Sequence, residues 1–449
     1  MFKKILIANR GEIAVRIIRT CRDMGIISVA VHSEADRDAL HVQIADESVC
    51  IGKAHAKDSY LNMDRIISAA LATGAEAIHP GFGFLSENCK FAEKCEEYGL
   101  VFIGPSHRSM RLMGDKIEAR KTAHAAGVPI TPGSTGEVSS FEEALKIANR
   151  IGYPLMIKAA AGGGGRGIRR VEGADGFEAL YNAAKNEAVA CFGDGRLYIE
   201  KYIVNPRHIE VQVLADSHGN TVHLYDRDCT VQRRHQKMLE EAPSSYINDK
   251  VREKMGKCAV EIARRCGYVN AGTVEFLVDK NRNFYFCEMN TRIQVEHPVT
   301  ESIIGIDLIR EQIRIAAGEK LPFSQKDIKI RGFAMECRIN AEDASKNFAP
   351  APGTILEMHQ PGGIGVRVDS GVYQGYTIPP FYDNMISKLI VTGETRADCI
   401  MRMKRAVSEY LFYGITTNID FHISVLNNEK FVSGEYGTDF CDELSGELK

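Results

Sequence analysis

The sequence contains no uninterrupted apolar run of about 18 residues, the length that a membrane-spanning helix needs. Its first apolar stretch follows Lys3 and Lys4 but is cut by Arg10 and Glu12, which makes it too short for the core of a signal peptide. Neither a transmembrane protein nor a secreted one is therefore expected. The stretch is better explained as a buried first strand, and the cytoplasm is the expected location.

The sequence also lacks a surplus of either charge and any Cys-x-x-Cys pair. Lys and Arg number 56 against 59 Asp and Glu, so the net charge of −3 predicts neither a nucleic acid nor an anionic membrane as partner. The 12 cysteines are scattered, which argues against a zinc site and a disulfide framework and predicts reduced thiols. The composition, 44% hydrophobic and 26% charged, is that of a globular protein and rules out disorder.

The N-terminal part of the chain alternates between predicted strands and helices. This rhythm predicts an open, mostly parallel, doubly wound sheet over residues 1–114. A site in such a sheet lies at the carboxyl ends of the strands, but the first turn lacks Gly-x-Gly-x-x-Gly, which disfavours a nicotinamide-binding protein. Strands are expected at Lys4–Asn9, Ile27–Val31, Ala77–His79 and Leu100–Ile103, and helices at Glu12–Met24, Ile66–Thr73 and Phe91–Tyr98.

A glycine run at residues 162–167 lies between strands predicted at Leu155–Ala160 and Ile168–Val171. Five of its six residues are glycine, and their bare amides can approach an anion closely. With the ammonium of Lys158 four residues earlier, the run predicts a clamp for nucleotide phosphates. It is not a Walker A loop, because no Lys-Ser/Thr follows it. A merely flexible loop is the alternative.

A strand and a charged run follow this small unit. His208, Glu210 and Gln212 alternate with apolar residues and share one face of a predicted strand. The run Asp226–Lys237 comes after the returning strand of that hairpin and is rich in Arg, His and Lys. We interpret it as an anion-facing loop, with a solvated charged surface as the alternative.

A hairpin predicted from Thr273–Val278 and Phe284–Asn290 carries the sharpest local signal. If its turn centres on Asn281, Glu275 faces position 287, one place from Glu288, and Asn290 shares a face with Glu288. Two carboxylates placed so closely require either a proton or a cation between them. Carboxylate and amide oxygens suit Mg²⁺ or Mn²⁺. A register slip that places the glutamates on opposite faces is the alternative.

Further charged side chains follow this hairpin. Pro298 ends the strand ladder, so residues 291–298 are expected to form a loop at its end. There Arg292 could hold a small planar anion, and Glu296 could serve as a general base. Farther along, Arg338 lies on a predicted strand beside Glu336, and local sequence alone favours a structural ion pair for it.

Together these segments resemble one family of enzymes. The string Glu288–Glu301 (EMNTRIQVEHPVTE) is so specific that chance agreement is negligible. The other matching segments are Ile7–Ala14, His79–Asn88, Met113–Lys116, Lys158 with residues 162–167, Arg227–Lys237 and Ala334–Glu342. Over essentially its whole length the chain resembles the biotin carboxylases, which have the ATP-grasp fold.

The resemblance implies a mixed α/β and α+β architecture with four parts. These are an N-terminal Rossmann-like domain at 1–114, a hinge and lid domain at 115–203, an ATP-grasp catalytic domain at 204–330 and a C-terminal lobe at 331–449. It also implies the reaction: ATP phosphorylates bicarbonate to carboxyphosphate, and CO₂ then passes to N1 of biotin on a carrier protein. ATP with Mg²⁺ or Mn²⁺, two ions in all, and carrier-bound biotin are the expected cofactors.

The resemblance assigns roles residue by residue. Lys237, Arg292, Gln294 and the Val295 backbone would hold bicarbonate, and Glu296 would deprotonate it. Arg338 would stabilise the biotin enolate, which replaces the purely structural role that local sequence favours. Glu275, Glu288 and Asn290 would hold the metal ions. ATP would be bound by Lys116, Lys158, Gly164, Gly165, Glu200, Lys201, Tyr202, Ile203, His208, Gln232, His235 and Leu277.

The expected partners follow from what the sequence does not contain. Biotin is attached within Met-Lys-Met in carrier domains, and the nearest segment here, Met403-Lys404-Arg405, does not match. The carrier and the carboxyltransferase are therefore expected as separate chains, and a homodimer is implied. An acetyl-CoA carboxylase subunit is the first interpretation, and a subunit of a pyruvate or other acyl-CoA carboxylase is the alternative. An ATP-grasp carboxylate–amine ligase and a non-enzymatic ATP-binding regulator are the competing classes.

Overall fold

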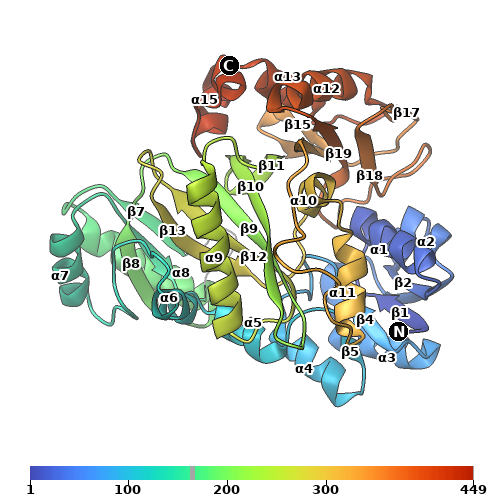
Figure 1. Cartoon of the computed structure of the whole chain (residues 1–449), viewed down its shortest axis with the longest axis horizontal. Helices are drawn as coiled ribbons and strands as arrows, with labels where there is room; N and C mark the ends of the chain where they lie inside the picture. Colours follow the sequence, from blue (N-terminus) through green and yellow to red (C-terminus); the bar gives the residue numbers. More distant parts are fainter. Residues whose placement is uncertain (162–166, 448–449) are drawn as a thin grey trace.

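The computed structural model describes residues 1–161 and 167–447 (Figure 1). A five-stranded parallel sheet forms first, in the order β3 (Glu47–Gly52), β2 (Ile27–Ser33), β1 (Lys4–Ile7), β4 (Ala77–His79) and β5 (Val101–Phe102). Along β1, Ile5 and Ile7 enter one hydrophobic core, whereas Leu6 enters the core on the opposite face. The predicted doubly wound unit is thus confirmed. Its helices are α1 (Gly11–Asp23), α2 (Leu40–Ile44), α3 (Met63–Thr73), α4 (Cys89–Glu97) and α5 (His107–Gly114), with 3₁₀ turns at Glu34–Asp36 and Ala56–Asp58.

A separate three-stranded antiparallel sheet, at the left of Figure 1, follows helix α6 (Lys116–Ala125). Its core includes the fully buried Ile157, Phe177 and Ile199, none of which belongs to the other cores. Tyr202 and Ile203 lie just beyond its strand Leu197–Lys201. Its elements are β7 (Ile168–Val171), β6 (Leu155–Ala159), β8 (Leu197–Lys201), α7 (Phe141–Ile151) and α8 (Phe177–Phe192).

The central feature is an eight-stranded antiparallel sheet. Strands from residues 207–290 and 333–393 join in it, because the strand ending at Ala242 pairs with the strand that contains Ala334. The sheet therefore extends across residue 331, where the C-terminal lobe was expected to begin. In spatial order the strands are β13 (Phe284–Asn290), β12 (Asn270–Val278), β9 (Arg207–Ala215), β10 (Thr221–Arg233), β11 (Gln236–Ala242), β14 (Phe333–Asn340), β19 (Met385–Gly393) and β18 (Val366–Ser370).

The expected loop at Asp226–Lys237 is wrong. Strand β10 continues through the charged run to Arg233, and β11 begins at Gln236. The charged side chains in the first part of the run, Asp226, Arg227 and Asp228, are buried within the sheet, and Asp226 and Arg227 are paired there. Asp226 accepts a hydrogen bond from Arg252 at 2.6 Å, and Arg227 donates to Glu210 at 2.6 Å. Such pairing removes the cost of burying a charge that made a loop the simpler prediction.

Helices and short strands complete the fold. Pro298, expected in a loop, lies in the first turn of a helix, where proline is well tolerated. Within the described ranges, no helix is both long and apolar enough to cross a membrane. These elements are α9 (Asp249–Arg265), α10 (His297–Ile304), α11 (Leu308–Ala316), α12 (Arg396–Glu409), α13 (Ile419–Asn427), α14 (Glu429–Ser433), α15 (Phe440–Glu447), β15 (Glu342–Asp343), β16 (Ala349–Pro350), β17 (Glu357–His359), β20 (Leu411–Tyr413) and a 3₁₀ turn at Ala344–Lys346.

Candidate active site

Lys237 on β11 is the hub of a buried ionic cluster. Its Nζ lies 2.5 Å from Glu210 Oε2, 3.0 Å from Glu275 Oε1 and 2.6 Å from Glu296 Oε1. Burial opposes the charge, but Cys229 and these carboxylates outweigh it and raise the pKa of Lys237 well above its ordinary value. The pKa shift therefore favours the charged ammonium, which carboxylates from β9, β12 and the loop before α10 hold in place.

The register of the β12–β13 hairpin corrects the expected placement of the two glutamates. Glu275 pairs directly with Glu288, whereas its neighbour Phe276 pairs with Phe286. A β-bulge at Cys287 therefore shifts the return strand by one residue. Glu275 and Glu288 face each other across adjacent strands, closer than the position-287 count implied.

Protein cations and amides already surround Glu275, so a shared proton is not needed. Its carboxylate accepts hydrogen bonds from the amides of Asn290 at 2.7 Å and Gln294 at 3.2 Å, and it pairs with Lys237. Burial would raise the pKa of Glu275, but Lys237 and His208 hold it well below its ordinary value. Of the expected proton or cation, the structure supplies cations: Lys237 pairs with Glu275, and Lys116 lies near Glu288.

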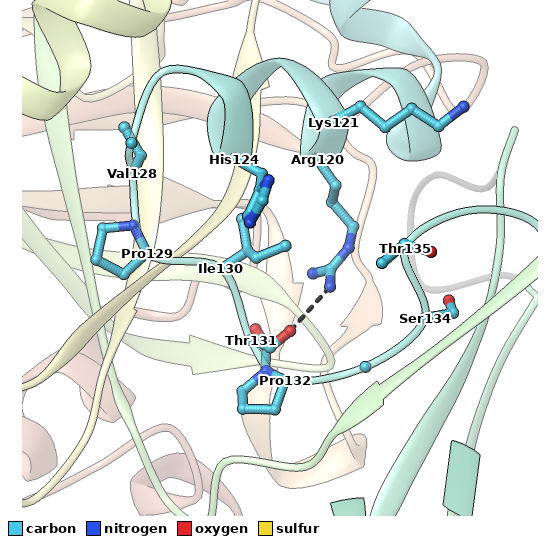
Figure 2. A pocket seen from close by; sticks show the side chains of 12 residues that line it. Arg120, Lys121, His124, Val128, Pro129, Ile130, Thr131, Pro132, Ser134 and Thr135 are labelled. Carbon is cyan, nitrogen blue, oxygen red and sulfur yellow. Dashed lines mark hydrogen bonds between the residues drawn. The ribbon is translucent and has the colours of Figure 1, made fainter. Parts of the chain in front are cut away.

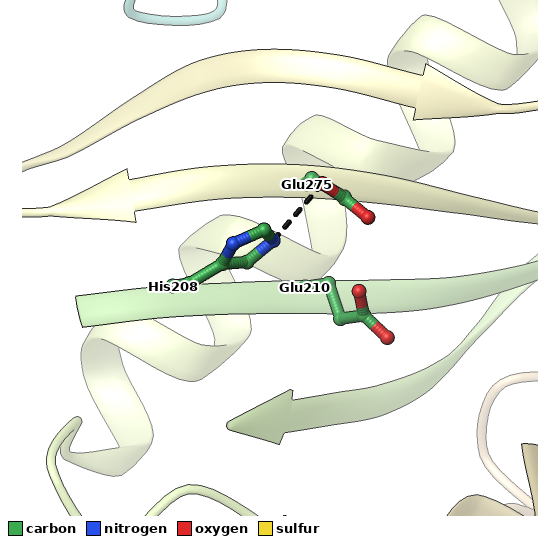
Figure 3. Close-up of side chains that lie close together, drawn as sticks. All are labelled: His208, Glu210 and Glu275. Carbon is green, nitrogen blue, oxygen red and sulfur yellow. Dashed lines mark ion pairs between the residues drawn. The ribbon is translucent and has the colours of Figure 1, made fainter. Parts of the chain in front are cut away.

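His208, Glu210 and Glu275 lie together on neighbouring strands (Figure 3). Each offers a ligand atom within 4.8 Å of the others, and His208 Nε2 lies 2.9 Å from Glu275 Oε2. Burial opposes protonation of the imidazole, but Glu275 outweighs it and raises the pKa of His208. We therefore interpret this trio as an ion-pair cluster rather than as a set of neutral metal ligands.

Arg338 and Lys237 both contact Glu296. Arg338 Nη2 lies 3.0 Å from Glu296 Oε2, and its Nε donates to Glu240 Oε1 at 2.6 Å. Burial disfavours the charge of Glu296, but Lys237 and Arg338 outweigh it and hold its pKa well below the ordinary value. Glu296 is thus an ionised carboxylate between two cations, and Arg338 forms its ion pairs with Glu240 and Glu296 rather than with the neighbouring Glu336.

Arg292, in the loop after β13, is fixed from three sides. Its Nε donates to Glu87 Oε2 at 2.9 Å, Nη1 to Gln294 Oε1 at 3.0 Å, and Nη2 to Asn290 Oδ1 at 3.1 Å. The guanidinium is thereby held at the end of the strand that carries Glu288. A planar, oriented guanidinium of this kind suits a planar anion.

The predicted nucleotide lysines lie near the small sheet. Lys116 Nζ lies 3.4 Å from Glu288 Oε2, and Lys158 on β6 pairs with Glu200 on β8. Burial opposes both ammonium charges, but Glu288 outweighs it at Lys116 and Glu200 at Lys158, so the pKa of each lysine is raised. Lys116 at the start of α6 therefore contacts the β12–β13 hairpin, whereas Lys158 pairs within the small sheet.

Only some of the remaining predicted nucleotide residues among the described residues lie beside one another. Gln232 Nε2 lies 3.4 Å from His208 Nδ1, and Leu277 pairs with His208 in the sheet register. The Lys201 ammonium donates to the Tyr153 carbonyl instead. His235 is exposed in the β10–β11 turn, Tyr202 and Ile203 lie just after β8, and Gly164 and Gly165 fall outside the described residues.

A pocket of about 510 Å³ lies between α6 and residues 127–135 (Figure 2). Arg120 donates there to the Thr131 carbonyl at 2.9 Å and also pairs with Glu200 at 2.8 Å. Of the described residues that line this pocket, none was predicted to bind nucleotide, bicarbonate or biotin. The pocket adjoins the predicted nucleotide residues: Arg120 pairs with Glu200, and the Lys201 N–H donates to the Pro132 carbonyl at 2.7 Å.

Three carboxylates in the cluster were not predicted as site residues. Glu210 shares its strand face with His208, and that alternation was the available signal. Glu87 lies within a family motif, but nothing local linked it to Arg292. Glu240 reaches Arg338 only through the pairing of β11 with β14, which no sequence pattern indicated.

Comparison with known proteins identifies the class and then the family. Family models match residues 1–110 (biotin carboxylase, N-terminal domain), 115–324 (carbamoyl-phosphate synthase L chain, ATP binding domain) and 336–443 (biotin carboxylase C-terminal domain). With the three larger sheets and the ionic cluster, these matches define an ATP-grasp ligase. Within that class, the chain belongs to the biotin carboxylase family.

Relatives and a solved structure agree with this assignment. Biotin carboxylase 1 of Bacillus subtilis is 57% identical, with 98% of each chain covered. A pyruvate carboxylase subunit from Methanothermobacter thermautotrophicus is also 57% identical, over 99% of this chain and 90% of that one. The biotin carboxylase domain dimer of Hydrogenobacter thermophilus 2-oxoglutarate carboxylase, solved with MgADP, ADP and bicarbonate, matches with a TM-score of 0.95, 50% identity and coverage of 99% and 98%.

Proposed function

We propose that this enzyme uses ATP and bicarbonate to carboxylate biotin that a separate carrier protein presents. The observation that carries the proposal is the contact of one buried carboxylate, Glu296, with Lys237 at 2.6 Å and with Arg338 at 3.0 Å. A base is thereby placed between a cation suited to bicarbonate and a cation suited to the biotin enolate. An amide-forming ligase has no need of the second cation.

Each of these groups takes part in one step of the reaction. Lys237, Arg292, Gln294 and the Val295 amide hold bicarbonate, and Glu296 takes its proton as an oxygen attacks the γ-phosphorus and ADP leaves. The carboxyphosphate then breaks into CO₂ and phosphate. That phosphate takes the proton from biotin N1, Arg338 stabilises the resulting enolate oxygen, and N1 attacks CO₂. Positioning and charge neutralisation supply most of the catalysis in such transfers.

The metal ions and the nucleotide have a suitable setting. Glu275, Glu288 and Asn290 offer the oxygen ligands that Mg²⁺ or Mn²⁺ prefers, and bound ions would neutralise phosphate charge. We assign the ATP phosphates to Lys116 and Lys158. The other nucleotide residues keep the roles that the resemblance implied, which include a closing lid for Gly164 and Gly165. We also keep the four domains with the bounds that the resemblance implied.

The expected assembly is a homodimer that meets its carrier and carboxyltransferase as separate chains in the cytoplasm. We favour acetyl-CoA carboxylase, the first step of fatty-acid synthesis, as the complex. The Methanothermobacter relative, a pyruvate carboxylase subunit of equal identity, supports a pyruvate enzyme as the second candidate. Identification of the carboxyltransferase that co-purifies with the native chain decides between them.

The first prediction concerns the purified protein with MgATP. ADP release should depend on bicarbonate and should rise several-fold when free biotin is added, because biotin consumes the carboxyphosphate-derived CO₂. A coupled assay of ADP formation, with ¹⁴C-bicarbonate incorporation in parallel, measures both. ADP release that ignores bicarbonate and biotin but responds to an added amine would instead indicate a carboxylate–amine ligase.

The second prediction tests the metal ligands. Glu288→Gln keeps the size of the side chain but removes a negative charge, so the Mn²⁺ concentration for half-maximal activity should rise about tenfold or more. Asp64→Asn, a change at an exposed carboxylate outside the cluster, serves as the control and should leave that concentration unchanged. An unaltered metal requirement in Glu288→Gln would remove Glu288 from the metal site.

A further inference from the structure

Two buried side chains hold the loop between Arg292 and α10 from behind. His297 Nδ1 lies 2.7 Å from the carbonyl oxygen of Gln294, and Lys388 Nζ lies 2.9 Å from that of Val295. Both side chains have 0% exposure. Two consecutive carbonyls in the predicted bicarbonate loop are therefore fixed by groups that sequence analysis did not select.

The planar peptide bond carries this constraint to the site. In a trans peptide the carbonyl and the following N–H point in opposite directions. A donor on the Gln294 carbonyl thus orients the Val295 N–H, and a donor on the Val295 carbonyl orients the Glu296 N–H. Both amides are held pointing away from His297 and Lys388, as a pair of anion-binding donors requires.

The protonation of the two groups fits this role. A carbonyl oxygen can only accept a hydrogen bond, so His297 must carry its proton on Nδ1. Burial, together with Lys388 and Arg16, lowers the pKa of His297 well below its ordinary value, so the ring stays neutral. Burial opposes the charge of Lys388, but Glu12 outweighs it and raises the pKa of the ammonium.

Lys388 and His297 also connect distant parts of the chain. Lys388 lies on β19 of the C-terminal part and pairs with the buried Glu12 of α1 at 3.1 Å. His297 is the first residue of α10, directly after the proposed base Glu296. The loop from Arg292 to Glu296 therefore lies where the N-terminal helix α1, the central sheet and its C-terminal strand β19 meet.

We propose that Lys388 and His297 are positioning residues for bicarbonate, which act by aiming the amides of Val295 and Glu296. The inference rests on the proposed function, because it takes this loop as the bicarbonate site. Lys388 and His297 touch neither bicarbonate nor nucleotide in this assignment. Their loss should therefore weaken bicarbonate binding selectively.

The test measures KM for bicarbonate and KM for ATP separately. Lys388→Met and His297→Phe should each raise KM for bicarbonate about tenfold, the effect of losing one buried hydrogen bond, with KM for ATP within about twofold of wild type. Lys388→Arg keeps the charge but moves the donor, so an increase of about threefold is expected. His297→Gln, which retains an N–H donor, should restore part of the binding.

Arg396→Met is the matched control. Arg396 is a C-terminal cation that pairs with Glu241 at 3.0 Å and donates to the carbonyls of Phe431 and Val432, far along the chain from the bicarbonate loop. Its loss should lower thermal stability without changing KM for bicarbonate.

Each outcome has one meaning. Unchanged KM for bicarbonate in both removal variants, or equal increases in both KM values, overturns the inference. If Lys388→Met does not fold, His297→Phe and Lys388→Arg decide by the same criteria. Wild-type protein without bicarbonate-dependent ADP release would instead refute the proposed function itself.

Discussion

Arg338→Met is expected to lower biotin carboxylation by about 100-fold or more, because the enolate oxygen loses its only assigned cation. Bicarbonate-dependent ADP release without biotin should fall much less, since Lys237 still contacts Glu296 at 2.6 Å. The ratio of the two rates, measured on one preparation with and without free biotin, separates the roles. Equal loss of both activities would show that Arg338 acts through Glu296 alone.

The variant should remain folded. Removal of Arg338 leaves Glu240 buried without its partner, which is costly for a carboxylate that must stay ionised. Burial already raises the pKa of Glu240 to about 7 against the pull of Arg338, so without that arginine the side chain will take up a proton. Arg338→Lys keeps a charge but not the fork geometry and should retain more carboxylation than Arg338→Met.

Local rhythm made much of the fold predictable. The strands Ala77–His79, Ile168–Val171 and Phe284–Asn290 match the sequence expectation residue for residue. Apolar alternation and helical spacing carry this information, because each element buries a face whose residues are close in sequence. Element ends were less predictable, since capping and pairing partners decide them.

The charged part of the sheet could not be read in the same way. Arg227 is fully buried and donates to Glu210, Gln212, Thr273 and Thr300, which lie on other strands and on a helix. Only the assembled sheet supplies these partners, so the isolated run resembles a solvated loop. The bulge at Cys287 is similar, because no glycine marks it and only the register reveals it.

The sequence predicted which residues form the site but not which of them pair with one another. Motifs selected Lys237, Glu275, Glu296 and Arg338, and the structure joins them through one continuous set of ion pairs. Their charge balance depends on Glu210 and Glu240, contributed by strands whose pairing no motif encodes. Sequence therefore predicted the chemistry, and the sheet topology determines how each group is charged.

Glu296→Gln is expected to lower both ADP release and carboxylation by about 100-fold to 10,000-fold, because the variant has no base to accept the bicarbonate proton. The low pKa of the free carboxylate makes it a weak base, held so by Lys237 and Arg338. A bound bicarbonate adds negative charge beside these cations and offsets their pull on Glu296. The base therefore gains strength only when its substrate is present.

A neighbouring carboxylate provides the control. Glu240→Gln removes the negative charge of a carboxylate that pairs with Arg338, but it leaves the contacts of Lys237 unchanged. A loss of activity of about tenfold or less is therefore expected. Comparable losses in the two variants would mean that the field at Arg338, rather than proton transfer, limits the rate. Undiminished ADP release in Glu296→Gln would exclude it as the base.

The stability of the protein in acid independently tests whether Glu296 is ionised in the folded protein. The folded pKa of Glu296 lies well below its ordinary value of 4.5, so its contribution to stability is present above that pH and lost as the pH falls further. The free energy of unfolding, from urea denaturation, should therefore decline less steeply below pH 4.5 in Glu296→Gln than in wild type. A parallel decline in both would show that Glu296 is not ionised in the folded protein, and a neutral Glu296 could not accept the proton of bicarbonate.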